Sequence, residues 1–439
     1  MLETAVGKPV TMNYRGTYVD SPNWIICQIG ARERYALARE LHRRGRLAAL
    51  CTDIWVTPES ISGRLAHLAG RRGVSFRERY DPALKDACVL SDQPASVVLQ
   101  RRRAYKRGGG TLWRPIMEAD RWLGSRMATR LERSGVLQAG PAQEAPVVFA
   151  YSYAAREIFE TARRFGCLTV LGQIDPGPVE DEIVAETARR HGFNIDGHER
   201  APPEYWENWR RECALADVII VNSKWSAKSL EKAGVDGGKI HIAPLAYEGL
   251  TSGNRQTVQR RYPASFSQER PLELLFLGQI GVRKGIFELL EAMDRLKGEP
   301  VKLTLVGPVQ DRLRERFRTS SQVKWIGKVP YGEIDAYYRA SDLFLLPTHS
   351  DGFALTQLEA QTWGLPIFVS RQCGEVVTDG ANGRLIDPVT ANSIEDLIRW
   401  ALVNPEALQA MSKQAFLQAK RFTAARSVDA LLEAIAGHQ

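Results

Sequence analysis

The stretch HSDGFALTQLEAQTWGLP (349–366) decides the fold, because it joins two strand-like runs through a loop and a helix. The flanking runs, DLFLLP (342–347) and PIFVS (366–370), are short and apolar, which is typical of strands buried in a sheet. The segment between them has the length of a helix, ends on a glycine and is stopped by a proline. The pattern predicts a strand, a loop that carries Asp351, a helix that carries Glu359, and a second strand.

The same alternation of strand and helix patterns runs through both halves of the 439-residue chain, which is too long for one ordinary core. Such alternation predicts parallel sheets with helices on both faces. The expected fold class is therefore α/β, with two doubly wound, Rossmann-like domains that face each other across a cleft. In sheets of this kind ligands bind beyond the carboxyl ends of the strands.

Polar sequence without periodicity, from Gly249 to Arg270, predicts a linker between the two domains. We expect an N-terminal domain at 1–250 and a C-terminal domain at 271–415. A last helix within 416–439 is expected to pack back on the N-terminal domain. The region 57–145 fits the alternation poorly and predicts an insertion of helices and loops.

The overall composition is that of a soluble globular protein, with 44% hydrophobic and 25% charged residues. Six scattered cysteines without a CxxC favour a reducing compartment and disfavour a structural zinc site. The amino terminus lacks the basic start and apolar core of a signal peptide, and no apolar run approaches the roughly 20 residues that span a bilayer. We therefore expect a cytoplasmic protein.

Positive charge is concentrated in the segment 101–133, where ten arginines and lysines accompany three acids. Apolar residues recur there at near-helical spacing: Leu112, Ile116, Leu123, Met127 and Leu131. One interpretation is a basic amphipathic helix that lies on the inner face of an anionic membrane or meets an anionic acceptor. The commoner alternative is a helix with an apolar core face and a solvated basic face. No nucleic-acid motif accompanies the charge, so no nucleic-acid partner is predicted.

The run GQIGVRKG (278–285) lies directly between a strand pattern and a helix pattern. Glycines such as Gly278 and Gly281 allow the backbone to approach a ligand closely, and the start of the helix offers N–H groups to a phosphate. Arg283 and Lys284 add two cations, which suit a diphosphate that gains charge as it leaves. The alternative is an ordinary turn with two exposed cations.

The helix of the opening stretch predicts a second anion site at its amino terminus. The N–H groups that would form it belong to Gly352, Phe353, Ala354, Leu355 and Thr356. Glu359 lies one turn further on the same side, where a carboxylate can accept both hydroxyls of a ribose. The alternatives are a surface carboxylate for Glu359 and a helix cap for Asp351. Together with the loop 278–285, the pattern is typical of a nucleotide-sugar site.

These features resemble the retaining glycosyltransferases of family 4, glycosyl transferases group 1, which share the two-domain GT-B fold. The family motif EGF-G-x-x-x-LEA-x-x-x-G-x-P is matched by DGFALTQLEAQTWGLP, with Asp351 in place of the first glutamate and Glu359 as the second. The run RKG followed by LLEA resembles the phosphate-gripping element, and EVVTDGANGRLIDP (375–388) resembles the segment that closes the domain. The run 212–248 is also characteristic of the family.

The resemblance implies an enzyme that transfers a sugar, with retention and without a metal or other cofactor, from a UDP- or GDP-linked donor. It implies that Arg283 and Lys284 bind the diphosphate, that Asp351 contacts the donor sugar and that Glu359 holds the ribose. The remaining donor-side residues are Gly278, Gly281, Lys328 and Val329, the last two beside the base, and the N–H groups of residues 352–356.

A saccharide or lipid-linked acceptor is expected on the N-terminal domain, in cell-envelope or exopolysaccharide assembly. The residues assigned to it follow predicted strands and are Gly30, Arg32, Tyr151, Ser152 and Asn222. Many family members have a histidine that faces the donor sugar where this chain reads FAYSYA. Two further departures are Gln279 in place of an arginine, and RQCG (371–374) in place of a glycine-rich loop.

Two other functions stay open, because a fold does not fix an activity. The first is a nucleotide-sugar-binding protein that has lost transfer, and the second is an epimerase or phosphorylase of the GT-B fold. The seven histidines show no paired-ligand spacing and no DxD occurs, so no metal site is predicted. His349 is interpreted as a loop residue.

Overall fold

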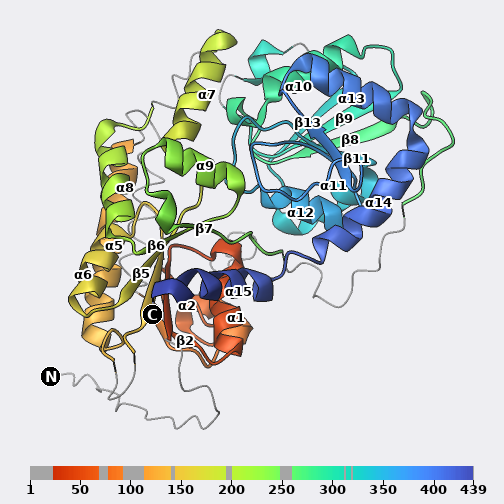
Figure 1. The fold of residues 1–439 in the computed structure, drawn as a ribbon. Coiled ribbons are helices and arrows are strands. Elements are labelled where there is room, and N and C mark those ends of the chain that lie inside the picture. The colour runs from red at the N-terminus through yellow and green to blue at the C-terminus, as the bar shows by residue number, and fades with distance from the viewer. Residues whose placement is uncertain are drawn as a thin grey trace.

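The computed structural model describes residues 23–68, 78–91, 113–139, 144–193, 200–247, 260–310, 313–317 and 320–438. Each half of the chain forms a parallel sheet with helices on both faces (Figure 1). The predicted α/β class with two doubly wound domains is confirmed. Residues 101–112 of the basic segment and 249–259 of the expected linker lie outside the described residues.

The N-terminal sheet has seven strands within the described ranges, in the order β3-β2-β1-β4-β5-β6-β7, and neighbouring strands are parallel. The strands are β1 (Trp24–Gln28), β2 (Leu47–Thr52), β3 (Val89–Ser91), β4 (Val147–Tyr151), β5 (Leu168–Gly172), β6 (Val218–Val221) and β7 (Ile240–Ile242). The central strands read as apolar runs because helices cover both of their faces; every residue of β1 is buried.

Helices cover the two faces of this sheet in two separate apolar clusters. The helices of the domain are α1 (Ala36–Arg43), α2 (Ile61–Leu68), α5 (Trp113–Ser134), α6 (Arg156–Arg164), α7 (Pro178–Arg190), α8 (Pro203–Leu215) and α9 (Lys224–Lys232). Helix α1 packs on one face, and α5, α6 and α8 pack on the other. Helix α7 extends toward the C-terminal domain (Figure 1).

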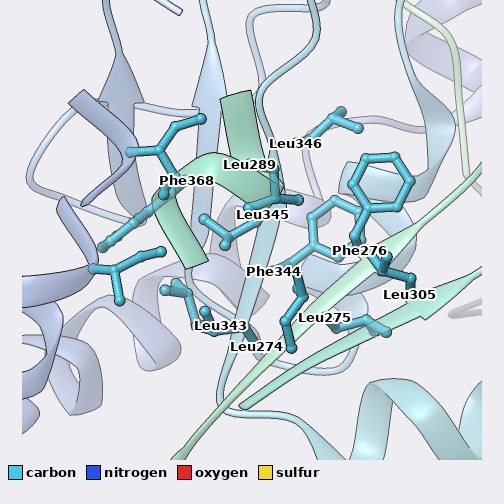
Figure 2. Close-up of a cluster of buried hydrophobic side chains, with 14 of the residues drawn as sticks. Leu274, Leu275, Phe276, Leu289, Leu305, Leu343, Phe344, Leu345, Leu346 and Phe368 are labelled. Atoms are coloured by element: carbon cyan, nitrogen blue, oxygen red, sulfur yellow. The ribbon is translucent and has the colours of Figure 1, made fainter. Parts of the chain in front are cut away.

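The C-terminal sheet has six strands in the part of the chain that the structure describes, in the order β10-β9-β8-β11-β12-β13. They are β8 (Leu272–Leu277), β9 (Val301–Val306), β10 (Val323–Gly327), β11 (Leu343–Leu346), β12 (Ile367–Ser370) and β13 (Gly383–Ile386). The helices are α10 (Ile286–Arg295), α11 (Ile334–Ala340), α12 (Leu355–Thr362), α13 (Ala391–Val403) and α14 (Pro405–Ala419). Leucine and phenylalanine side chains of β8, β9, β11 and β12 fill the core with Leu289 of α10 (Figure 2).

The chain returns to the N-terminal domain after α14. Helix α15 (Ala424–Ile435) lies beside α1 (Figure 1), and its Val428 and Leu431 are buried in the cluster that contains α1. Arg44 Nη1, next to α1, lies 2.6 Å from Asp429 Oδ1. The carboxyl-terminal helix α15 therefore packs on the N-terminal domain.

In the described part of the basic segment, the apolar side chains do not face outward as the membrane interpretation requires. Leu123, Met127 and Leu131 of α5 are buried, and the last two belong to the N-terminal core with α6. The part of the expected apolar stripe from Leu123 to Leu131 is thus buried, and the hypothesis that it faces a membrane is wrong for these residues. Arginines such as Arg114 and Arg121 form its exposed face. Among the helices in the described ranges, none has the length and apolar character that crossing a bilayer requires.

Candidate functional site

The loop between β8 and α10 presents two cations at the carboxyl edge of the C-terminal sheet. It contains a 3₁₀ turn at Val282–Lys284, after which α10 begins at Ile286. Gly285 has φ 67°, and a Cβ there would lie 1.9 Å from the carbonyl oxygen of Pro347, so only glycine fits. The turn thereby brings Arg283 and Lys284 against the loop that follows β11.

Asp351, in that second loop, pairs with both cations. Its Oδ2 lies 3.0 Å from Arg283 Nη1 and also accepts a hydrogen bond from Lys284 Nζ. Its Oδ1 accepts the N–H of Phe353 at 3.0 Å. Burial acts to raise the pKa of Asp351, but Lys284 and Arg283 outweigh it and lower the pKa well below its usual range. The structure thus joins three predicted site residues in one ion cluster.

The helix after this loop begins later than predicted. Helix α12 starts at Leu355, and Ala354 before it has φ 65° in the left-handed region. The Phe353 N–H is taken by Asp351, and the Phe353 side chain, 2% exposed, packs against Phe422. The expectation that Gly352–Ala354 open the helix is therefore wrong. Leu355 and Thr356 occupy its first turn, where N–H groups have no partner within the helix.

Glu359 lies on α12, one turn after Leu355, and is partly buried. Its Oε2 accepts a hydrogen bond of 2.8 Å from the hydroxyl of Tyr338, a buried residue of α11. This bond fixes the direction of the carboxylate. Lys328 and Val329 follow β10 at the same edge of the sheet; the lysine is exposed and the valine is partly buried.

A cavity of about 260 Å³ lies between the two domains. Its C-terminal wall contains Gln279, Gly281, Arg283, Lys284 and Gln310, and its N-terminal wall includes Trp113, Tyr153, Asp175, Gly177, Glu180, Asp181, Arg200, Tyr205 and Trp206. The two predicted cations thus face a wall that was not predicted from the sequence. Its acids come from the β5–α7 loop and the first turn of α7.

Two of these acids have pKa values displaced by burial. Burial raises the pKa of Glu180 to about 7, although Arg283, with Nη1 3.6 Å from Glu180 Oε2, acts to lower it. Burial also raises the pKa of Asp175. Asp175 Oδ1 accepts hydrogen bonds from the Tyr153 hydroxyl at 2.6 Å and from the Gly177 N–H at 2.9 Å. The N-terminal wall is therefore held by its own hydrogen bonds.

The domains touch directly beside the ion cluster. A Cβ on Gly352 would lie 2.3 Å from the carbonyl oxygen of Ile174, so the loop after β11 lies against the loop after β5. Trp225 Nε1, in the first turn of α9, donates to Ser350 Oγ at 3.0 Å. These contacts bring the predicted donor loop within reach of the N-terminal domain.

A second interdomain contact involves two histidines and one glutamate. His191 Nε2, just after α7, and His349 Nε2, in the loop after β11, each lie 2.9 Å from Glu288 Oε1 on α10. The His191 ring also stacks on Phe287, with centroids 4.5 Å apart. His349 is therefore part of the cluster that joins the two domains, which the sequence of its loop does not indicate.

The predicted acceptor-side residues lie at the carboxyl edge of the N-terminal sheet. Arg32, Tyr151 and Ser152 line a cavity of about 180 Å³, with the Arg32 guanidinium 4.9 Å from the centre of the Tyr151 ring. The buried Ser152 hydroxyl has no hydrogen-bond partner among the described residues. Asn222 lines a separate small cavity with Tyr151, while the Gly30 N–H donates to Asp53 Oδ1 at 2.9 Å.

Residues 259–418 match the family model described as Glycosyl transferases group 1. A D-inositol 3-phosphate glycosyltransferase of Segniliparus rotundus is 31% identical over 235 residues, which make up 50% of this chain and 52% of that protein. The chain spans about half the length of the curated relatives it matches.

Two solved structures match most of the chain. Sucrose-phosphate synthase from Thermosynechococcus elongatus superposes with a TM-score of 0.63 at 16% identity, and Anabaena Alr3699/HepE in complex with UDP with a TM-score of 0.58 at 15% identity. Each comparison covers 95% of this chain and 100% of the other. At such identities the likeness concerns the fold, which is the two-domain GT-B architecture.

Proposed function

We propose that this protein is a retaining glycosyltransferase that uses a UDP-linked sugar, because residues 259–418 match the model of glycosyl transferases group 1 and the chain has the GT-B architecture. The donor lies on the C-terminal domain and the acceptor on the N-terminal domain. Transfer takes place across the cavity between them.

The observation that carries the proposal is the ion cluster of Arg283, Lys284 and Asp351 at the carboxyl edge of the C-terminal sheet. Two cations held by a largely buried carboxylate, 13% exposed, are ordered before a ligand arrives, which lowers the cost of binding a diphosphate. Glu359, oriented by Tyr338, stands at the same edge and is assigned to the ribose. Leu355 and Thr356 add N–H groups for phosphate or sugar oxygens.

The choice of uridine is supported by the structural neighbours. The Anabaena protein has structures in complex with UDP, with UDP and glucose, and with UDP-glucose. A GDP-linked donor is the alternative. Lys328 and Val329 are assigned to the base because they follow β10, which lies two strands from β8 and its cation loop.

In the proposed reaction the acceptor hydroxyl oxygen bonds to the anomeric carbon while the bond from that carbon to the β-phosphate oxygen breaks. The hydroxyl proton passes to the departing phosphate oxygen, and the new bond forms on the face that the phosphate leaves. Arg283 and Lys284 stabilise the charge that develops on the diphosphate. Positioning of both substrates supplies the rest of the rate increase.

The acceptor is proposed to be a saccharide or lipid-linked saccharide of envelope or exopolysaccharide assembly. A peripheral membrane contact is proposed through the exposed arginines of α5, such as Arg114 and Arg121, without insertion of its buried apolar side.

Slow hydrolysis of the donor tests the proposal without a known acceptor, because water then replaces the acceptor hydroxyl. Proton NMR of UDP-glucose with the protein should show α-glucose released first, before it equilibrates with the β anomer. Lys284→Ala should slow this release about 100-fold, as loss of a charge-stabilising group does. The control Lys302→Ala changes an exposed lysine of β9 and should have no effect.

Other results of this NMR experiment would favour a different mechanism or a different function. Release of β-glucose first would contradict retention. UDP-glucose that binds without turnover, even with sugar acceptors present, would favour a binding protein, and a sugar that isomerises while still attached to UDP would favour an epimerase.

A further inference from the structure

The N-terminal wall of the interdomain cavity is aromatic. Tyr153 and Tyr205 stack with centroids 4.9 Å apart and planes at 17°. Trp113 and Trp206 approach Tyr205 to 4.8 and 5.0 Å. These four side chains, from α5, α8 and the loop after β4, all line the cavity. The four rings thus form one contiguous aromatic cluster that borders the cavity on the side opposite Arg283.

The wall is held in place by its backbone and by a buried carboxylate. Tyr153 has φ 77°, a left-handed conformation that a tyrosine adopts only under constraint. Its N–H donates to Glu212 Oε2 at 2.7 Å, and its hydroxyl donates to Asp175 Oδ1 at 2.6 Å. Glu212 is 2% exposed and accepts the Ala155 N–H as well. The Tyr153 ring therefore has a fixed position before any ligand binds.

The charged groups around the wall are mainly hydrogen-bond acceptors. Asp175, Glu180 and Asp181 line this side of the cavity. Among the described residues of this wall Arg200 is the one cation, and its Nε donates to Asp181 Oδ2 at 2.9 Å. Carboxylates accept hydrogen bonds from hydroxyls and repel anions. A ligand on this side is accordingly rich in hydroxyls and carries no negative charge.

We propose that the wall formed by Trp113, Tyr153, Tyr205 and Trp206 is the acceptor subsite and that it takes a neutral pyranose ring. The C–H face of the ring lies on the aromatic side chains, and its hydroxyls bond to the carboxylates. This inference rests on the proposed function and adds the acceptor's class to it. It also moves the acceptor from the predicted residues Arg32, Tyr151 and Ser152 to the cavity that Arg283 and Lys284 share.

Saturation-transfer NMR with a panel of methyl glycosides (glucoside, galactoside and mannoside, both anomers) tests the proposal on the full chain in the presence of saturating UDP. At least one glycoside should bind, with the strongest transfer to protons on one face of its ring. Tyr205→Ala should weaken that binding about tenfold or more, since stacking area is lost, while Tyr205→Phe should retain it. The control Trp122→Ala removes a tryptophan of α5 that does not line the cavity.

UDP affinity, measured on the same samples, shows that each variant is folded and keeps its donor site. The proposal would be overturned if the protein binds UDP but binds none of the glycosides. It would also be overturned if Tyr205→Ala and the wild type bind the glycoside equally. Displacement of the glycoside by UDP would also overturn it, because the ring would then occupy donor space. Failure of UDP to bind would contradict the proposed function instead, and the glycoside titration without UDP would still decide whether the wall binds sugar.

Discussion

Arg283 of the C-terminal domain lies 3.6 Å from Glu180 of the N-terminal domain, measured from Nη1 to Oε2. The same nitrogen lies 3.0 Å from Asp351 Oδ2, so one cation is shared between a carboxylate of each domain. Because Arg283 is assigned to the donor diphosphate, the ionised form of Glu180 opposes the charge of that ligand across the cavity.

Removal of the Glu180 charge should therefore strengthen UDP binding in a pH-dependent way. Burial raises the Glu180 pKa to about 7, so the group is mostly neutral at pH 6 and charged at pH 8. Glu180→Gln should bind UDP about fivefold more tightly than the wild type at pH 8, from roughly 1 kcal/mol of lost repulsion, and equally at pH 6. Calorimetric titrations at both pH values measure the difference.

Comparison of variant and wild type at each pH cancels the titration of UDP itself. Glu182→Gln, an exposed change on the same helix, is the control and should match the wild type throughout. Equal UDP affinity of Glu180→Gln and wild type at pH 8 would show that Glu180 does not face the diphosphate.

Asp351→Asn should destabilise the protein, because it leaves the buried Lys284 ammonium without its carboxylate and leaves the partly buried Arg283 with Glu180 alone. Loss of one partner of a buried ion pair costs about 3–5 kcal/mol in free energy of unfolding. Urea denaturation at pH 7 measures this cost. Asp387→Asn, which breaks the exposed Arg371–Asp387 pair, should cost less than about 1 kcal/mol.

The contribution of the Asp351 carboxylate to the free energy of unfolding should also be lost in strong acid. Since the pKa of Asp351 is lowered on folding, its stabilisation is present above the ordinary carboxyl pKa and is lost as the pH falls toward the folded-state value. The difference in free energy of unfolding between the wild type and Asp351→Asn should thus become smaller below about pH 4. A gap that stays constant with pH would contradict the ion cluster.

Tyr338→Phe should weaken UDP binding without unfolding the protein. The change removes the hydroxyl that donates to Glu359 Oε2 at 2.8 Å and keeps the buried ring. Because the Glu359 carboxylate is then less well oriented, the protein should bind UDP about 3- to 10-fold more weakly, which is the size of one ordinary hydrogen bond. Calorimetry measures the loss, with Tyr337→Phe on the same helix as the control; identical affinities of the two variants would exclude an orienting role for Tyr338.

His191→Ala should loosen the contact between the domains. The change removes a partner of Glu288 and the ring that stacks on Phe287. The scattering radius of gyration should increase, and the free energy of unfolding should fall by about 1–2 kcal/mol. Arg189→Ala, whose side chain is 70% exposed and pairs with Glu186 on its own helix, should change neither quantity. An unchanged radius for His191→Ala would mean that other contacts suffice to hold the domains together.

Local sequence patterns were sufficient for the cation loop and for the position of Glu359. The spacing of glycines and the change from a strand to a helix period can both be read from a short stretch of sequence. Gly285 is one such glycine, and its place is fixed because a Cβ there would collide with the backbone of Pro347. The helix start was placed too early because left-handed Ala354 has no sequence signature; glycine is the residue normally expected there.

The N-terminal wall was missed for two reasons. Helix α7 was not predicted, although its start has a legible signal: Gly177, Pro178 and then the acids Glu180 and Asp181 in the first turn. The contacts of Asp175 and Glu180 join residues far apart in the chain, such as Glu180 and Arg283, and such pairs follow only from the packing of one domain on the other. The same holds for His191 and Glu288.

The most direct test of the donor site is calorimetric titration of UDP, GDP, ADP and dTDP into the wild type, Glu359→Ala and the exposed control Glu406→Ala. UDP should bind the wild type and the control equally. Its affinity for Glu359→Ala should fall at least tenfold, the equivalent of about 1.5–3 kcal/mol for hydrogen bonds to a charged group. Binding of none of the nucleotides, or UDP binding that Glu359→Ala leaves unchanged, would contradict the assignment of this edge to a nucleotide sugar.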